Sequence, residues 1–469
     1  MAQTNGKHAS VEPVIVAAAF PAFGHSGGPA QICNHLSKKG YKVYFISSPD
    51  FKKAAEHNGV DFVVNTYWPR LEYFQEREQI PDPHKRIISD FKAVFGEAIP
   101  PNFKLLKETL ARARVENPSA PIVILHEVLY QGLLPFLYGA PLPDGFDALP
   151  PIVNFSTSNN FASDPMIPPF GPSLPYALTE ENIALWAQIR ASMKPSEKEL
   201  NDHYNAIMKD LGSTQEMTGW LWDTVLEIGA VTLFPASAST DYPHTTDVSK
   251  RYKYIGGLPL KPLGPDYQPP EWWPLITDNA ALPDAERKKV VFVTQGTVSM
   301  DYTQLITPTI RALSNRDDLI VVVTLGARGA TLPVDEQAGG IKKLPDNTKV
   351  VDFIPYDLVL KFADLFVSNA GYNGYMHGVM NGVPQVLSGM DADKGEVSQR
   401  AEYSGVAVNL HTQTPTEEAI LAGVEKILKD GKYAKRAAEL KKENEDLSSL
   451  GTVERIINEL AEGKYSVDD

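Results

Sequence analysis

A chain of 469 residues, 43% apolar and 22% charged, is long enough for two globular domains and is unlike a disordered or fibrous protein. Its 44 basic and 58 acidic residues give a net charge of −14, which argues against nucleic acid or an anionic membrane as its partner. The single cysteine, Cys33, permits no internal disulfide, and with a polar amino-terminus and no membrane-spanning apolar run it predicts a cytoplasmic protein without a membrane anchor.

The first predicted elements form a strand–helix–strand unit. A strand, a glycine-containing loop, a helix and a second strand are expected in turn over residues 14–19, 20–28, 29–39 and 41–46. A unit of this length begins a doubly wound parallel sheet. Further strands are expected over residues 62–64, 121–125, 152–155 and 230–234.

Between residues 155 and 176 the chain is rich in serine, asparagine, proline and phenylalanine, a composition typical of a loop. Loops at strand ends often collect binding residues, although a plain surface connector has the same composition. Three phenylalanines favour a binding role, and with residues 67–74 they could line an apolar pocket. The candidates for contact with a small molecule are Phe155, Phe161 and Phe170.

Residues 258–285 contain seven prolines beside Trp272 and Trp273, which predicts an inter-domain linker without helix or strand interior. The expected division is therefore a first domain over 1–257 and a second over 286–450. A last helix within 451–469 is expected to pack back on the first domain.

A second strand–helix series follows the linker. Its strands are expected over residues 290–294, 319–325, 348–353, 365–367, 385–387 and 407–409, and its later helices over 302–313, 416–429, 434–447 and 452–462. The two halves look like copies of one architecture. The predicted fold class is therefore α/β, with two Rossmann-like domains facing across a ligand cleft.

Residues 367–399 carry the strongest local pattern. Asn369-Ala370-Gly371 bends the chain from a strand into a helix beginning near Tyr372, and Gly382-Val383-Pro384 ends that helix. A helix amino-terminus after a glycine turn offers unpaired N–H groups to an anion such as a diphosphate. An ordinary strand–helix turn would have the same outline.

The order of residues in this segment resembles the donor-binding segment of nucleotide-sugar-dependent glycosyltransferases of the GT-B type. It is most similar to fungal members of the family 1 UDP-dependent glycosyltransferases, which glucosylate lipophilic small molecules. The matching residues are Asn369, Ala370, Gly371, Tyr372, Asn373, Gly374, His377, Gly382-Val383-Pro384 and Asp393-Lys394. The resemblance is dense in the second half and sparser in the first.

The resemblance implies a role for each donor-binding candidate. The phosphates would meet Gly296, Thr297 and the helix start at Gly371, Tyr372 and Asn373. Asn369 stands where many relatives carry a histidine, and an amide cannot become cationic. Phe353 would stack on the base, and the backbone of Ile354 would contact its edge.

Two further positions depart from the family pattern. His377 stands at the place of a ribose-binding glutamate, and an imidazole can also bond a hydroxyl. Asp393 and Lys394 match an Asp-Gln pair that holds the sugar hydroxyls, with an ammonium in place of the amide. A solvated loop is the alternative for this pair, and core packing is the alternative for Phe353.

His25 follows the first strand in a segment similar to the family's Pro-x-x-Gly-His, whose histidine accepts the proton of the acceptor hydroxyl. A catalytic imidazole needs a carboxylate to orient it, and Glu127 is the candidate, one methylene longer than the family's aspartate. Its neighbour His126 should point to the opposite face of the strand.

The resemblance implies an inverting transfer of a sugar, expected to be glucose, from a UDP-sugar to a hydroxyl of a phenolic or lipophilic molecule. The UDP-sugar is a co-substrate, and no cofactor or metal is expected. Asp391-Ala392-Asp393 has a metal-binding spacing but matches the sugar-binding loop better. The alternatives are a UDP-sugar epimerase of the same fold and a non-catalytic nucleotide-sugar binder. A nicotinamide or flavin oxidoreductase is disfavoured because Gly24-His25-Ser26-Gly27-Gly28 does not spell the dinucleotide fingerprint.

Overall fold

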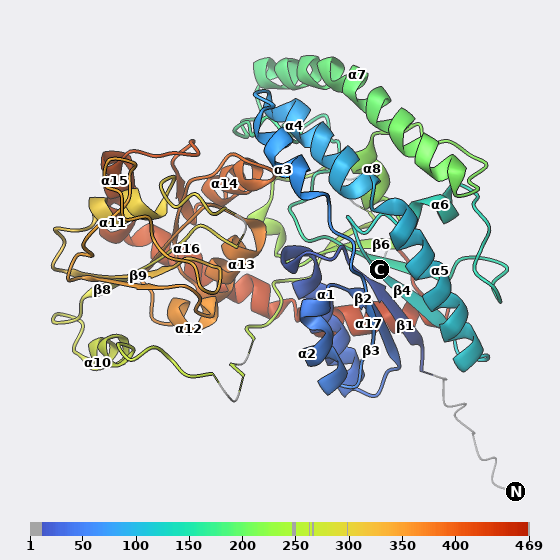
Figure 1. Ribbon diagram of the computed structural model, residues 1–469, viewed down its shortest axis with the longest axis horizontal. Coiled ribbons are helices and arrows are strands. Elements are labelled where there is room, and N and C mark those ends of the chain that lie inside the picture. Colours follow the sequence, from blue (N-terminus) through green and yellow to red (C-terminus); the bar gives the residue numbers. More distant parts are fainter. Residues whose placement is uncertain (1–11, 246–249, 262, 265–266, 298, 468–469) are drawn as a thin grey trace, which may run out of the picture.

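The computed structural model describes residues 12–245, 250–261, 263–264, 267–297 and 299–467. Over these residues the chain forms two α/β domains, each built on one parallel sheet (Figure 1). This confirms the predicted fold class. The amino-terminal segment 1–11 and the linker positions 262, 265 and 266 lie outside the described residues.

The first sheet has the strand order β3-β2-β1-β4-β5-β6-β7, with every neighbouring pair parallel. Its strands are β1 (Val14–Ala18), β2 (Val43–Ser47), β3 (Asp61–Val64), β4 (Ile122–Glu127), β5 (Ile152–Phe155), β6 (Val231–Phe234) and β7 (Tyr252–Tyr254). Near-continuous apolar runs form these strands because helices cover both faces. The sequence did not predict β7, and β4 continues two residues beyond its expected end.

The helices of the first domain are α1 (Phe23–Lys38), α2 (Lys52–His57), α3 (Leu71–Glu78), α4 (Pro83–Asp90), α5 (Ile99–Glu116), α6 (Leu134–Leu137), α7 (Glu180–Asp210) and α8 (Leu221–Leu226). The short turns are η1 (Pro49–Phe51), the π-helical η2 (Phe91–Gly96) and η3 (Ala238–Thr240). Helix α1 begins six residues before the expected start, so the predicted loop 20–28 is mostly helix. Gly28 is a packing residue in this helix, because a Cβ there would lie 2.9 Å from a ring carbon of Phe155.

The second sheet has the order β10-β9-β8-β11-β12-β13, again all parallel. Its strands are β8 (Lys289–Thr294), β9 (Leu319–Thr324), β10 (Thr348–Val351), β11 (Leu365–Ser368), β12 (Gln385–Leu387) and β13 (Ala407–Asn409). The helices of the second domain are α10 (Pro274–Ala281), α11 (Ile306–Ala312), α12 (Tyr356–Leu360), α13 (Tyr372–Asn381), α14 (Lys394–Tyr403), α15 (Glu417–Lys429) and α16 (Gly431–Asp446), and α17 (Ser449–Ala461) follows them.

Helix α10 corrects the expectation that residues 258–285 contain no helix. Pro274 occupies its first turn, where a missing N–H costs nothing. Trp273 and Ile276 are buried against Val290 and Phe292 of the second sheet, so this part of the segment packs on the second domain.

Helix α17 returns to the first domain after the second is complete (Figure 1). Its buried residues Val453, Ile456 and Ile457 belong to the same apolar cluster as the side chains of α1 and β4. The chain therefore passes between the domains twice, once near residue 258 and again between α16 and α17.

Candidate active site

A cavity of about 650 Å³ lies between the two domains. In each sheet the strand order reverses beside the first strand, between β1 and β4 and between β8 and β11. Ligands of open parallel sheets bind at the carboxyl ends of strands at such a switch point. Both switch points contribute to the cavity wall, through His25 after β1, Gly296 after β8 and Asn369 after β11.

His25 lies in the first turn of α1, and its Nδ1 is 3.0 Å from Oε1 of Glu127 at the end of β4. Thr157 Oγ1 donates to the same carboxylate oxygen at 2.8 Å and lies 3.1 Å from Nδ1 of His25. The edges of Phe20 and Phe95 further confine the imidazole. With its Nδ1–H donated to Glu127, the neutral ring keeps Nε2 as its basic nitrogen.

Glu127 is fully buried, and two backbone N–H groups, those of Phe20 and Leu129, donate to its oxygens at 3.3 Å. Burial raises the pKa of Glu127, but the charge and hydrogen bond of His25, with the Thr157 and Phe20 bonds, outweigh it and lower the pKa. The carboxylate is therefore held ionised beside the imidazole.

Burial lowers the pKa of His25, whereas the charge of Glu127, the hydrogen bond to it and the charge of Asp393 together raise it above the ordinary value. His126, next along β4, points away from the cleft and has its Nδ1 2.8 Å from Asn154 Oδ1. Of the two adjacent side chains, only Glu127 contacts His25.

The second-domain loops form a cradle of neutral donors. Gly296 has a positive φ of 78° and turns the chain after β8, with Thr297 exposed beside it. Asn369 Nδ2 donates to the backbone oxygen of Gln295 at 2.5 Å, which fixes one loop against the other. Ala370 has a φ of 61°, an uncommon conformation for a residue with a Cβ.

Helix α13 begins at the cleft without a side-chain cap, so its first N–H groups are available to an anion. Gly371 is its N-cap residue, and Tyr372 is buried beneath the turn. Asn373 Nδ2 donates to the backbone oxygen of Gly24 at 2.8 Å. This bond ties the start of α13 to the start of α1, which is also uncapped by a side chain.

The expected base and ribose residues also line the cavity. Phe353 follows β10, with the guanidinium carbon of Arg328 4.9 Å from its ring centroid, so one ring face is already occupied. The side chain of Ile354 is buried in the core, which leaves its backbone to meet a ligand. His377 Nδ1 lies 2.7 Å from Asp357 Oδ1, a partner that the sequence did not suggest.

The loop before α14 contacts the first domain. Ser158 Oγ donates to Asp393 Oδ2 at 2.9 Å, and Arg86 pairs with Asp391 at 2.8 Å. The two carboxylates of the Asp-x-Asp spelling are thus directed to different partners, an arrangement that disfavours a shared metal ion. Lys394 Nζ lies 3.4 Å from the backbone oxygen of Asp391 and lines the cavity.

The apolar side of the cavity lies in the first domain. Phe161 and Phe170 line it, but Phe155 does not: its side chain is fully buried in the core between the first sheet and α1. The expectation that Phe155 contacts an acceptor is therefore corrected. The sequence did not single out further apolar lining residues of the first domain, among them Ile87, Phe91, Phe95, Leu129 and Trp222.

Thr157 and Ser158 were also missed as individual residues. They lie two and three residues after the end of β5, at the carboxyl edge of the sheet, and this position was the available signal. The sequence contained no signal for Asp357, because its contact with His377 depends on how α12 packs against α13.

Two Rossmann-like domains that face each other across a cleft have the architecture of the GT-B class, and this cleft has an imidazole–carboxylate pair on one wall and helix-end donors on the other. Residues 319–460 match the family described as the C-terminal domain of erythromycin biosynthesis protein CIII-like proteins. The chain is 34% identical over 448 residues to UDP-glucosyltransferase 1 of Beauveria bassiana (strain ARSEF 2860), covering 94% of each. The chain belongs to the family 1 UDP-glycosyltransferases.

Other relatives agree with this placement. UDP-glucosyltransferase B1 of Starmerella bombicola is 30% identical over 464 residues, covering 96% of this chain and 99% of that protein. Among solved structures, the kitacinnamycin glycosyltransferase matches the fold with a TM-score of 0.65 at 19% identity, covering 96% of this chain and 99% of the other. The calicheamicin glycosyltransferase CalG4 matches with a TM-score of 0.63 at 17% identity, covering 96% and 98%.

The protein is therefore an enzyme that transfers a sugar from a UDP-sugar. This result favours transfer over the epimerase and the non-catalytic binder, and it disfavours the oxidoreductase. Among the residues that the structure describes, no helix combines the length and the apolar character that crossing a membrane requires.

Proposed function

We propose that the enzyme transfers glucose from UDP-glucose to a hydroxyl of a phenolic or otherwise lipophilic small molecule, with inversion at the anomeric carbon. The observation that carries this proposal is the contact of 3.0 Å between His25 Nδ1 and Glu127 Oε1 at the wall of the cavity. A base held in this way, beside an aromatic wall and opposite a helix-end cradle, suits deprotonation of an apolar alcohol.

In the proposed step, Nε2 of His25 takes the proton of the acceptor hydroxyl. The acceptor oxygen forms a bond to the anomeric carbon while the bond from that carbon to the diphosphate oxygen breaks. The diphosphate leaves with the electron pair, and Glu127 stabilises the imidazolium. A single displacement of this kind inverts the configuration.

The leaving diphosphate would be received by Gly296, Thr297, Asn369 and the start of α13. Hydrogen bonds and a helix dipole at this place support a reaction that needs no metal ion or other cofactor. Unchanged turnover after dialysis against a chelator is the expected result, and loss of turnover restored by Mg²⁺ would contradict it.

The acceptor would lie against Phe161, Phe170 and Trp222, whose aromatic surfaces favour flat, apolar molecules. A cytoplasmic location stays a prediction from the single buried cysteine.

The test is incubation of the purified protein with UDP-glucose and a panel of flavonoids, simple phenols and long-chain alcohols. Mass spectrometry is expected to find hexosides of phenols, and proton NMR is expected to show a β-glucoside, the inverted product of the α-linked donor. An α-glucoside would refute the single displacement. Conversion of UDP-glucose to another UDP-hexose without an acceptor would favour the epimerase.

A further inference from the structure

The loop between β5 and α7 belongs to the first domain in sequence but is held by α14 of the second. Glu396 Oε1 accepts hydrogen bonds from the backbone N–H groups of Gly171 at 2.9 Å and Ser173 at 2.8 Å. Gln399 Nε2 donates to the backbone oxygen of Ser173 at 2.8 Å. The approach is so close that a Cβ on Gly395 would overlap Ser173 Oγ.

Arg400 makes the second attachment. Its Nη2 donates to the backbone oxygen of Asn160 at 3.1 Å, and its Nε donates to Asp241 Oδ1 at 2.6 Å. Its Nη1 donates to Glu396 Oε2 at 2.9 Å, while the guanidinium lies 4.4 Å from the ring centroid of Tyr242. Arg400 is 1% exposed, so this ion cluster lies almost wholly out of water.

Buried charges of this kind are costly when a partner is removed, so the loop is tied to the position of α14. Asp241 is itself held on the first-domain side, where Asn160 N and Tyr254 OH both donate to its Oδ2 at 3.1 Å. The cluster therefore joins the two domains through hydrogen-bonded charges, and it leaves the loop little freedom to move independently of the helix.

The attached loop also contains the two phenylalanines that line the proposed acceptor site. Phe161 and Phe170 stand between the two attachment points, at residues 157–160 and 171–173. At its first end, Thr157 contacts Glu127 and Ser158 contacts Asp393, directly before α14. One helix thus begins beside the expected sugar-binding pair and continues along the loop that shapes the acceptor pocket.

We propose that Glu396, Gln399 and Arg400 are positioning residues that couple occupancy of the donor site to the shape of the acceptor pocket. A sugar bound at Asp393 and Lys394 fixes the start of α14 and orders the attached loop before the acceptor arrives. Binding of the acceptor then does not include the loss of conformational entropy that ordering the loop requires. The inference rests on the proposed acceptor site.

The first measurement is hydrogen–deuterium exchange of residues 156–176, with and without UDP-glucose and with no acceptor present. In the wild type, UDP-glucose is expected to slow exchange in this loop about tenfold. In Glu396→Gln and in Gln399→Ala the slowing is expected to disappear. Glu402→Gln changes a partly exposed residue of the same helix that pairs with His411 and makes none of the bonds to residues 156–176; it is the matched control and is expected to behave as the wild type.

The second measurement is turnover of 4-methylumbelliferone. Glu396→Gln is expected to raise the KM for this phenol about tenfold, since hydrogen bonds to a charged group are lost, with kcat within about twofold and the Kd for UDP unchanged. A purely structural role would instead lower the amount of active enzyme and leave every KM unchanged. Gln399→Ala leaves the buried charges intact and serves as the decisive variant if Glu396→Gln does not fold.

The proposed coupling would be overturned by either of two results. One is a hydrogen–deuterium exchange rate of the loop that UDP-glucose does not change in the wild type, and the other is an unchanged acceptor KM in both variants. Failure of the proposed function has a different result: no acceptor in the panel is glucosylated, whereas the exchange experiment still reports whether α14 orders the loop.

Discussion

The two switch points of this enzyme share one topology but carry opposite kinds of side chain. Between β1 and β4 the first domain places a titratable pair, His25 and Glu127, and holds it with Thr157. Between β8 and β11 the second domain places neutral donors, Asn369 and the uncapped start of α13. The two sheets form the same kind of crevice, and in the proposed mechanism the side chains at the strand ends determine whether a crevice transfers a proton or binds a phosphate.

The same contrast gives a physical reason why the proposed phosphate site needs no cationic side chain at position 369. A base that becomes charged when it accepts a proton needs an oriented carboxylate, and a buried carboxylate stays ionised only where hydrogen bonds and an opposite charge offset its burial. A diphosphate already carries its charge, so fixed N–H dipoles suffice to bind it. Substitutions at each switch point should therefore fail in different ways.

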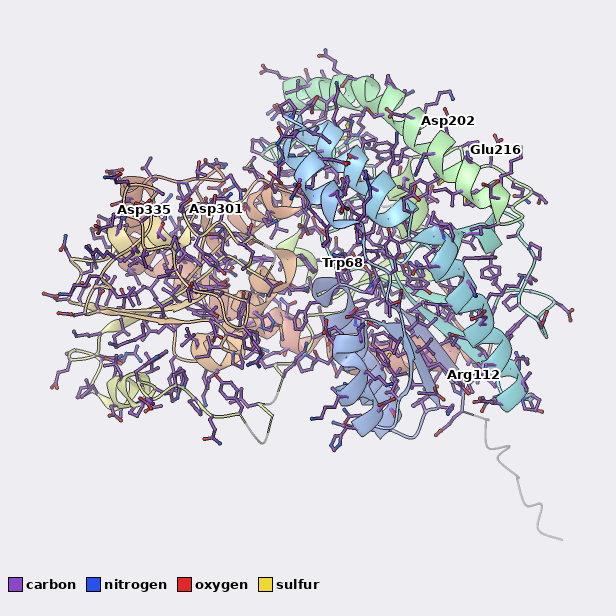
Figure 2. All side chains as sticks on the ribbon, in the orientation of Figure 1. Trp68, Arg112, Asp202, Glu216, Asp301 and Asp335 are labelled. Carbon is purple, nitrogen blue, oxygen red and sulfur yellow. The ribbon has the colours of Figure 1, made fainter. Side chains whose placement is uncertain are left out.

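The largest effect is expected for His25→Ala. Loss of the base should lower kcat/KM about 10³-fold, because no other group takes the acceptor proton. The Kd for UDP, measured by calorimetry, should stay unchanged. Asp202→Asn, on the exposed side of α7 away from the cleft (Figure 2), is the matched control and should retain full activity. Full turnover in the alanine variant would remove His25 from the mechanism.

Glu127→Gln should have the next largest effect, lowering kcat/KM about 100-fold at neutral pH. In the wild type kcat/KM should rise with pH and level off above the raised pKa of His25, since only the neutral imidazole accepts a proton. In the variant His25 is still buried but no longer lies beside the charge of Glu127, so its pKa should fall. The rise of kcat/KM should therefore occur at lower pH. If kcat/KM rose at the same pH in the variant and the wild type, the titrating group would not be His25.

The same pair predicts a stability window. Since the folded pKa of His25 is raised, its contribution to folding is complete below the ordinary imidazole pKa and is lost as pH rises through the raised value. Since the pKa of Glu127 is lowered, its contribution is present above the ordinary carboxyl pKa and is lost as pH falls through the lowered value. The melting temperatures of the wild type and Glu127→Gln should therefore differ most at pH values between the ordinary carboxyl pKa and the ordinary imidazole pKa.

A smaller effect is expected at the second switch point. Asn369→Asp keeps the shape of the side chain but puts a negative charge beside the phosphates and removes the donor to Gln295 O. The Kd for UDP should rise about 30-fold, because like charges placed together are costly. The pH at which kcat/KM rises should not change. A change in that pH would mean that the residue at position 369 influences the pKa of His25.

The smallest effect is expected for Phe353→Ala, which should raise the Kd for UDP about fivefold through loss of base stacking. Arg328 lies on this ring, so Arg328→Ala tests which face the base uses. Tighter UDP binding in Arg328→Ala would indicate that the guanidinium competes with the base. An unchanged Kd for UDP in Phe353→Ala would indicate that Phe353 serves core packing and does not stack on the base.

The strands other than β7, and helix α13, could be predicted because apolar runs and turn residues mark them locally. Residues Gln385–Leu387 and Ala407–Asn409 match their expected bounds, and Gly382, with a φ of 70°, caps α13 as expected. The start of α1 was missed because Gly27 and Gly28 suggested a loop, whereas the absence of a side chain at Gly28 lets the helix lie close to Phe155 of β5. Helix α10 was missed because Pro274 was interpreted as a helix breaker although it lies in the first turn.

The site was predictable where chemistry follows a strand end and unpredictable where it depends on contacts across the cleft. The pair of His25 and Glu127 follows from two adjacent parallel strands. Phe155 was misassigned, although strand alternation places it with Val153 on the face toward α1. The bonds of Arg400 to Asp241 and Asn160 join residues at least 159 positions apart, and one sequence contains no trace of such pairings.

The return of α17 to the first domain imposes an order on how this chain is made. Val453, Ile456 and Ile457 are fully buried beside α1, so the oldest part of the nascent chain lacks part of its interior until the last helix leaves the ribosome. At ordinary rates of synthesis the first sheet waits roughly 10–40 s for this segment. The first domain thus completes its interior only after the second domain has been synthesised.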